Sequence, residues 1–163
     1  MKRRTLLGTA SSVGIIALTG CLGGGEGDGT PTDTETATET DTDTPSPTLT
    51  DSGFTVVNNE NGVQTDNARV SVDGSKVVVE GTIWGRDGCR TATLGSTNYN
   101  TESDELTVDV ATTRTEDAGD MCTQAIVEIT YRATISFENG LPGSVVVTHS
   151  RGDTSEEVTT TSL

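Results

Sequence analysis

The fold of this chain is decided by one stretch of sequence, VEITYRATISFE, which runs from Val127 to Glu138. Apolar side chains occupy its odd-numbered positions, and polar or charged side chains occupy the even-numbered ones. Successive side chains of a β-strand point to opposite faces of a sheet, so this alternation predicts one long strand with a buried face and a solvated face. An amphipathic helix would instead need apolar residues three and four positions apart. The stretch therefore predicts a sheet that other parts of the chain must complete.

Shorter strand patterns lie on both sides of this stretch and are separated by turn signals such as Asp73-Gly74 and Asn139-Gly140. The other predicted strands cover residues 54–57, 68–72, 76–84, 90–99, 106–110, 145–149 and 157–161. Seven or eight short strands without a helical pattern predict an all-β, antiparallel β-sandwich of the Ig-like or Greek-key type. A small barrel is the alternative. The single tryptophan precedes both cysteines of this region, so the immunoglobulin signature proper is absent.

The first 20 residues have the pattern of an export signal. Three cations at positions 2–4 precede a short apolar segment that is diluted by glycine and alanine and ends in Leu18-Thr19-Gly20-Cys21. A membrane-spanning helix needs about 20 apolar residues, which this segment does not supply. We therefore predict a signal peptide over residues 1–20 that is cleaved before Cys21. An uncleaved N-terminal anchor is the alternative.

This arrangement resembles the signal of a twin-arginine-exported lipoprotein of a halophilic archaeon. The resemblance implies that Arg3 and Arg4 direct export and that Cys21 carries a lipid. The composition fits the same organisms, because the formal net charge is −15 and processing would leave Lys76 as the only lysine. Such a surface repels itself in dilute solution, whereas in molar salt the Debye length falls to about 3 Å and the repulsion largely vanishes. An acidic bacterial surface protein is the alternative.

The segment that follows Cys21 is rich in threonine, aspartate and glutamate and has no cation and no apolar periodicity. Such a segment cannot bury enough apolar surface to offset the entropy of ordering it, so we expect a disordered acidic stalk. Like charges and prolines extend a chain of this kind. The predicted organisation is a signal peptide over residues 1–20, the lipidated cysteine and stalk over 21–52, and one β-sandwich domain over 53–163.

Two cysteines remain in the domain, Cys89 and Cys122. An even pair in an exported domain predicts a disulfide, which would close a loop of about 33 residues. Metal ligation is the alternative, but two thiols and one distant histidine fall short of a four-ligand site. Together with the strand at 106–110 and the turn Leu141-Pro142-Gly143, these cysteines resemble small single-disulfide β-domains of secreted and lipid-anchored prokaryotic proteins. That resemblance implies a sandwich with a bridge and implies no activity.

Candidate contact and metal residues are few. Trp84 and Tyr99 are candidate contacts for a partner or a sugar, although packing against the second sheet explains Trp84 at least as well. Glu116, Asp117 and Asp120 form a weak candidate set for Ca²⁺, for which we favour the interpretation of a solvated acidic loop. The sequence therefore predicts no cofactor and no strong metal site.

The single histidine, His149, shares a predicted strand face with Val145 and Val147. A catalytic triad would require it beside a nucleophile and a carboxylate, and the chain has no Gly-x-Ser-x-Gly motif. We therefore interpret His149 as a structural residue near a strand end. With no catalytic constellation in the sequence, we expect the protein not to be an enzyme, and a hydrolase ranks last among the hypotheses.

Charge and signal together define the function hypotheses. The acidic balance argues against nucleic acid, because phosphates require a basic footprint. The sequence predicts a lipoprotein of the cell membrane, held by the lipid on Cys21, with its domain facing the exterior. The leading hypothesis is a non-catalytic binding or envelope-interaction module whose partner is an envelope protein or a glycan. The alternative is an accessory subunit or solute-binding partner of a membrane transport or redox complex.

Overall fold

The computed structural model describes residues 45–163, which contain eight strands and no helix. The strands are β1 (Thr48–Asn61), β2 (Asn67–Asp73), β3 (Lys76–Gly85), β4 (Arg90–Asn100), β5 (Glu105–Arg114), β6 (Val127–Glu138), β7 (Ser144–Arg151) and β8 (Thr154–Ser162). No helix in this part of the chain is therefore long and apolar enough to cross a membrane. The predicted export signal with Arg3 and Arg4, the predicted lipid site at Cys21 and the stalk up to residue 44 lie outside the described residues.

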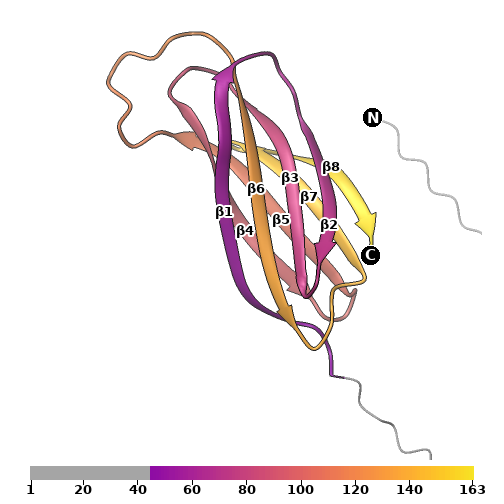
Figure 1. Ribbon diagram of the computed structural model, residues 1–163. Coiled ribbons are helices and arrows are strands. Elements are labelled where there is room, and N and C mark those ends of the chain that lie inside the picture. The colour runs from indigo at the N-terminus through magenta and orange to yellow at the C-terminus, as the bar shows by residue number, and fades with distance from the viewer. Residues whose placement is uncertain (1–44) are drawn as a thin grey trace, which may run out of the picture. The chain divides into compact units, whose positions relative to one another are not determined.

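The strands form two four-stranded sheets that pack face to face (Figure 1). The β6 sheet has the order β1-β6-β3-β2, and the β7 sheet has the order β4-β5-β7-β8. The all-β sandwich expected from the sequence is thus confirmed. Neighbouring strands are antiparallel except for β5 and β7, which run parallel because the chain crosses to the other sheet through β6 between them.

The core lies between the sheets and is built from the inward-facing residues of the central strands. Every apolar side chain of the alternating run on β6 is buried, whereas the intervening polar side chains are half-buried or exposed. The buried apolar residues are Val77, Val79, Ile83, Ala92, Leu106, Val108, Val110, Val127, Ile129, Tyr131, Ala133, Ile135, Phe137, Val145 and Val147. Burying a side chain of this size stabilises the fold by about 1.5–3 kcal/mol, so these strands supply most of the driving force for folding.

The folded domain begins earlier than the sequence predicted. The expected boundary at residue 53 lies inside β1, which starts at Thr48 and pairs with β6 from Glu138 onward. Backbone hydrogen bonds to β6 hold this polar stretch as an edge strand, and Leu49 packs against the core. Composition could not reveal this, because residues 48–52 have the same threonine and aspartate content as the stalk before them.

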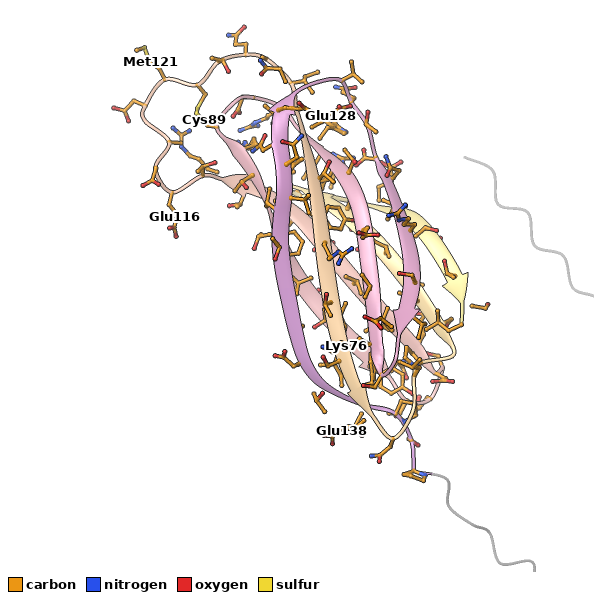
Figure 2. All side chains as sticks on the ribbon, in the orientation of Figure 1. Lys76, Cys89, Glu116, Met121, Glu128 and Glu138 are labelled. Carbon is orange, nitrogen blue, oxygen red and sulfur yellow. A yellow bond between two sulfur atoms is a disulfide. The ribbon has the colours of Figure 1, made fainter. Side chains whose placement is uncertain are left out.

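The strands run along the long axis of the domain, so the domain has two ends, which we call poles (Figures 1 and 2). Thr48 pairs with Glu138 at one end of the β1–β6 ladder, and Glu60 pairs with Glu128 near the other. Because β1 has two register shifts between these pairs, the distance follows from β6, where they are ten residues apart, or roughly 33 Å at about 3.3 Å per residue. We call the end at Thr48, where the chain enters, the entry pole and the opposite end the distal pole. Figure 2 shows Glu138 at the entry pole and Cys89 and Glu128 at the distal pole.

Candidate functional site

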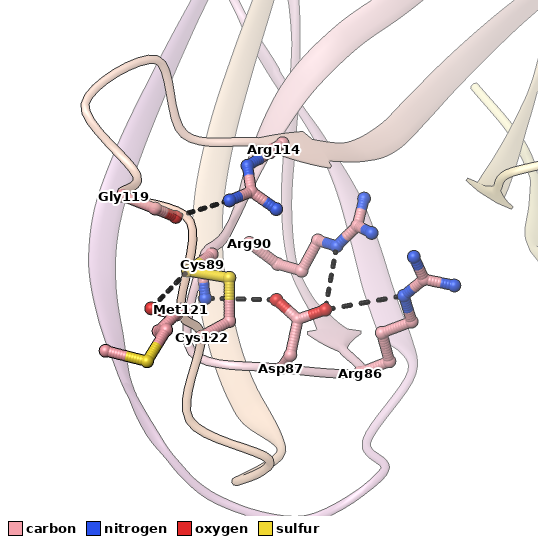
Figure 3. Close-up of a disulfide and its surroundings, with 8 residues drawn as sticks. All are labelled: Arg86, Asp87, Cys89, Arg90, Arg114, Gly119, Met121 and Cys122. Atoms are coloured by element: carbon pink, nitrogen blue, oxygen red, sulfur yellow. Dashed lines mark hydrogen bonds and ion pairs between the residues drawn. A yellow bond between two sulfur atoms is a disulfide. The ribbon is translucent and has the colours of Figure 1, made fainter.

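The predicted disulfide is present at the distal pole. Cys89 and Cys122 are bonded, with their Cα atoms 5.5 Å apart (Figure 3). The bond joins the β3–β4 turn to the long β5–β6 loop, which has no strand structure of its own. The amide of Thr115 donates a hydrogen bond of 2.8 Å to the carbonyl oxygen of Cys89, which adds a second link between these segments. The bridge thereby holds the turn after β3 in a defined place.

A pocket with a volume of about 430 Å³ opens beside this turn. Its lining comes from the end of β3, the β3–β4 turn, the start of β4, the end of β5 and the β7–β8 hairpin. The lining residues are Trp84, Arg86, Arg90, Thr112, Arg151, Gly152 and Thr154. This Trp84 pocket lies at the distal pole, because Trp84 pairs with Glu128 in the ladder between β3 and β6. Its volume falls within the range of about 300–1,000 Å³ that is usual for small-ligand sites.

Trp84 reaches the pocket because β2 ends short of it. Trp84 lies on the less buried face of β3, and the last β3 residue paired with β2 is Thr82. The indole is therefore half-buried instead of covered by a neighbouring strand. The guanidinium of Arg151, from β7 in the other sheet, lies 4.8 Å from the centre of the Trp84 ring. This cation–π contact is worth about 0.5–1 kcal/mol at a partly exposed site.

Arg86 and Arg90 are both oriented by Asp87, which lies between them in sequence. Each arginine donates from Nε to the same carboxylate oxygen of Asp87 at 3.4 Å (Figure 3). The other oxygen accepts a hydrogen bond of 3.1 Å from the amide of Cys89. Burial alone would raise the pKa of Asp87, but the Cys89 amide and the two arginines lower it below its usual value. The carboxylate therefore stays ionised and holds both guanidinium groups.

The third arginine of the pocket is held by two carboxylates. Nη1 of Arg151 donates to Asp66 at 2.8 Å, and Nη2 donates to Glu156 at 3.3 Å. Asp66 lies immediately before β2, and Glu156 lies on β8, so the guanidinium connects three segments of chain. Only 17% of the Arg151 side chain is exposed, compared with 73% for Arg86. Arg151 therefore forms a fixed wall of the pocket, whereas the Arg86 side chain is largely exposed to solvent.

Behind the pocket, a buried hydrogen-bonded chain links the two sheets. His149 on β7 is fully buried, with Nδ1 2.7 Å from Asp66 and Nε2 2.8 Å from the hydroxyl of Tyr131 on β6. Burial lowers the pKa of His149, although the Asp66 carboxylate partly opposes that shift. The neutral ring donates from Nδ1 to Asp66, so Nε2 accepts the proton of the Tyr131 hydroxyl. Tyr131 is also fully buried, and β6 and β7 belong to different sheets. These hydrogen bonds therefore form a buried cross-link between the two sheets.

Tyr99, the second candidate contact, is not brought to Trp84. It lies near the end of β4 at the entry pole, edge-on to Phe137 with ring centres 5.5 Å apart. Its hydroxyl donates a hydrogen bond of 2.6 Å to Asp104, which, with partial burial, raises the pKa of Tyr99 to about 12. The two aromatic residues therefore belong to different ends of the domain.

The weak calcium candidates Glu116, Asp117 and Asp120 are exposed in the β5–β6 loop. Within residues 45–163, the only group of side chains placed to share a metal ion is Asp87, Cys89 and Cys122. Two of these ligand atoms are the sulfur atoms of the disulfide, which leaves no thiolate for a metal. A solvated acidic loop stays the favoured interpretation of these residues, with calcium binding as its weaker alternative.

Sequence reasoning missed the arginines of the Trp84 pocket. The signal that could have identified them is scarcity, because residues 45–163 contain only seven cationic side chains. They are Arg69, Lys76, Arg86, Arg90, Arg114, Arg132 and Arg151. Two of the three pocket arginines flank the Asp87-Gly88 turn directly after Trp84, and the third ends the strand that carries His149. The two segments lie far apart in the sequence, and their convergence depends on how the sheets pack.

Comparison with known proteins adds no family to this description. No protein-family model, curated protein or solved structure gives a significant match to the chain. The function of the site therefore has to be inferred from its own geometry and chemistry.

Proposed function

We propose that this protein is a lipid-anchored lipoprotein of the cell surface whose β-sandwich is a non-catalytic binding module. Cys21 carries the lipid, the acidic segment after it forms the stalk, and the sandwich faces the exterior. The stalk would join the domain at Thr48. The observation that supports this proposal best is that the Trp84 pocket lies at the opposite pole.

The position of the pocket suits a module that reaches outward. The chain enters at Thr48, and the pocket lies level with Glu128, roughly 33 Å away along β6. A domain held at its entry pole would present the distal pole to whatever lies beyond the membrane. A pocket beside Thr48 would instead face the anchor.

The lining suits binding better than catalysis. Its side chains are those of three arginines, a tryptophan and two threonines, and no carboxylate, histidine or free thiol is among the lining residues. General acid–base catalysis needs a group whose pKa lies near the working pH. His149 is such a residue by type, but it is fully buried and directed to Asp66 and Tyr131. We therefore assign the pocket the role of holding a ligand.

The anchor can be tested by mass spectrometry of the membrane fraction of producing cells. We expect the mature chain to lack residues 1–20 and to carry a lipid on Cys21. The Cys21→Ser variant should be lost from the membrane fraction. An unmodified N-terminus on membrane-associated protein would contradict the anchor.

The binding role can be tested by retention on envelope preparations from the same cells. The mature chain with Cys21→Ser, which has no lipid, is added in solution, and the retained fraction is measured. We expect the further change Arg86→Glu to reduce retention, because it reverses a charge at the pocket rim. Arg69→Glu is the matched control, since Arg69 is similarly exposed and lies outside the pocket. Equal retention of both variants would contradict binding through this pocket.

A further inference from the structure

The Trp84 pocket concentrates positive charge in an acidic protein. Three of the seven cationic side chains in residues 45–163 line it, although the chain as a whole has a formal net charge of −15. No carboxylate is among its lining residues. The counter-charges Asp87, Asp66 and Glu156 contact the arginines from outside that lining. A ligand that enters the pocket therefore meets guanidinium groups first.

Two of these guanidinium groups keep their binding edges available. Arg86 and Arg90 each contact Asp87 through Nε, and in the described part of the chain their Nη atoms have no hydrogen-bond partner. Figure 3 shows both guanidinium forks directed away from Asp87 toward the same side. The paired N–H groups of a guanidinium match the two oxygens of a carboxylate or the oxygens of a sulfate group. Asp87 is thus a positioning residue for two anion-binding forks.

The remaining lining adds features that suit a sugar ring. The indole of Trp84 is an apolar group that has one ring face against the Arg151 guanidinium and is otherwise half-buried, so its uncovered part is what it offers to a ligand. Thr112 and Thr154 are the hydroxyl-bearing residues of the lining. A pyranose ring has apolar C–H faces and hydroxyl edges, so it can lie against an indole and exchange hydrogen bonds with hydroxyl side chains. A volume of about 430 Å³ accommodates one or two such rings.

The charge of the whole domain restricts the ligand further. A densely charged polymer such as a nucleic acid would be repelled by the acidic surface that surrounds the pocket. A ligand with one anionic group per bound ring avoids most of that repulsion and still satisfies the two free forks. Short-range hydrogen bonds of this kind also persist in salt that screens longer-range repulsion.

We propose that the Trp84 pocket binds an anionic saccharide, with its carboxylate or sulfate group on Arg86 and Arg90 and its ring against Trp84. This inference rests on the proposed binding function and names the ligand class for the same pocket. Two kinds of saccharide carry such an oxyanion on a sugar ring. They are uronic-acid oligomers, through a carboxylate, and sulfated oligosaccharides, through a sulfate group.

Trp84 is the only tryptophan in the chain, so its fluorescence reports directly on the pocket. The mature Cys21→Ser protein is titrated with digalacturonate, with a monosulfated galactose disaccharide, and with the neutral galactose disaccharide. We expect a saturable change with one or both acidic sugars and binding at least about tenfold weaker for the neutral one. Acetate and sulfate ions should bind weakly, because they lack the ring that packs on the indole.

Variants assign the binding to the pocket. Arg86→Gln should weaken binding of the acidic sugar by about fivefold to tenfold, because it removes one charged hydrogen-bonding group at a largely exposed site. Arg90→Gln should act in the same direction, and Arg69→Gln should leave binding unchanged. Arg86 is the cleaner test, since its exposed side chain contributes little to folding. Thermal unfolding of each variant confirms that the domain is folded.

Several results would overturn the inference. Equal affinity for acidic and neutral sugars would remove the role of the arginines, and equal affinity for acetate or sulfate would reduce the pocket to a simple anion site. Tighter binding of an oligonucleotide or a phosphopeptide would assign it to another class of ligand. If Arg86→Glu abolishes envelope retention but digalacturonate and the sulfated sugar do not compete, the proposed function stands and the saccharide inference fails.

Discussion

Asp66 is the residue that connects the interior of the domain to its pocket. One of its oxygens accepts hydrogen bonds from both Nδ1 of His149 at 2.7 Å and Nη1 of Arg151 at 2.8 Å. Tyr131 completes the buried side of this chain, and Trp84 lies against Arg151 on the pocket side. The position of a wall of the pocket therefore depends on a hydrogen bond made in the core.

His149 makes the stability of the domain depend on pH. Because burial lowers its pKa, unfolded His149 takes up a proton at a higher pH than native His149 does. The unfolded state therefore binds more protons just below pH about 6.5, and the free energy of unfolding falls as the pH falls through that window. The charged and titratable groups that face the ring are Asp66, Tyr131, Arg151 and Asp109.

The measurement is urea unfolding between about pH 7 and pH 5, above the range in which carboxylates titrate. His149 is the only histidine of the chain, so a slope in this window belongs to it. We expect His149→Gln to be less stable at every pH and to lose most of the slope. A variant that keeps the slope of the parent protein would contradict this assignment.

Gly81 on β3 should tolerate no side chain. A Cβ atom there would lie 2.4 Å from the carbonyl oxygen of Asn67 and 2.6 Å from the hydroxyl of Tyr131. We expect Gly81→Ala to lower the free energy of unfolding by about 1–3 kcal/mol through overpacking. Gly53→Ala on β1 is the matched control, since nothing lies within 4 Å of the added atom. Chemical denaturation of both variants tests this, and equal stabilities would contradict it.

At the scale of elements, alternation in the sequence identified the strands but not all of their neighbours. The run on β6 predicted a long strand with one buried face, and the structure has that strand between Val127 and Glu138. The shorter runs located the other seven strands, although β1 extends well beyond the predicted residues 54–57. Alternation determines which face of a strand is buried and carries no information on its partner. The parallel pairing of β5 with β7 could therefore not be predicted.

The disulfide should stabilise the domain mainly by closing a long loop, which lowers the entropy of the unfolded chain. Cys89 and Cys122 are 33 residues apart, and a loop of that length gives a stabilisation of about 3–4 kcal/mol in the chain-entropy model. We expect the Cys89→Ser, Cys122→Ser double variant to lose about that much in guanidinium unfolding. Reducing agent should destabilise the parent protein to a similar degree and leave the variant unchanged. A parent protein that is insensitive to reduction would contradict the prediction.

At the scale of the whole molecule, the pocket was hidden from sequence reasoning because its parts are distant in the chain. Trp84 and Arg151 come from different sheets, and they meet only because β2 stops before the end of β3. The sequence identified Trp84 as a candidate contact but not Arg151. It contained no sign that the β3–β4 turn and the β7–β8 turn share one pole, since that depends on sheet packing and not on local pattern.

Net charge is the whole-molecule property with the clearest consequence for stability. A chain with a formal charge of −15 repels itself in dilute solution, and salt screens that repulsion. We expect the unfolding temperature to rise as sodium chloride is increased to about 1 M, where the Debye length has fallen to about 3 Å. Sucrose at matched osmolality is the control, because it screens no charge. An unfolding temperature that is independent of salt would contradict this prediction.

The placement of Thr48 and the Trp84 pocket at opposite poles also determines how the domain would carry mechanical load. With the stalk pulling at Thr48 and a bound ligand pulling at the pocket, the force runs along the strands. β1 would then have to slide lengthwise past β6, and the cross-strand hydrogen bonds between them lie perpendicular to that motion. The whole ladder resists such shear together, whereas strands peeled from one end separate bond by bond. If the domain is tethered and loaded as proposed, β1 should therefore resist separation under this shear better than it would under peeling.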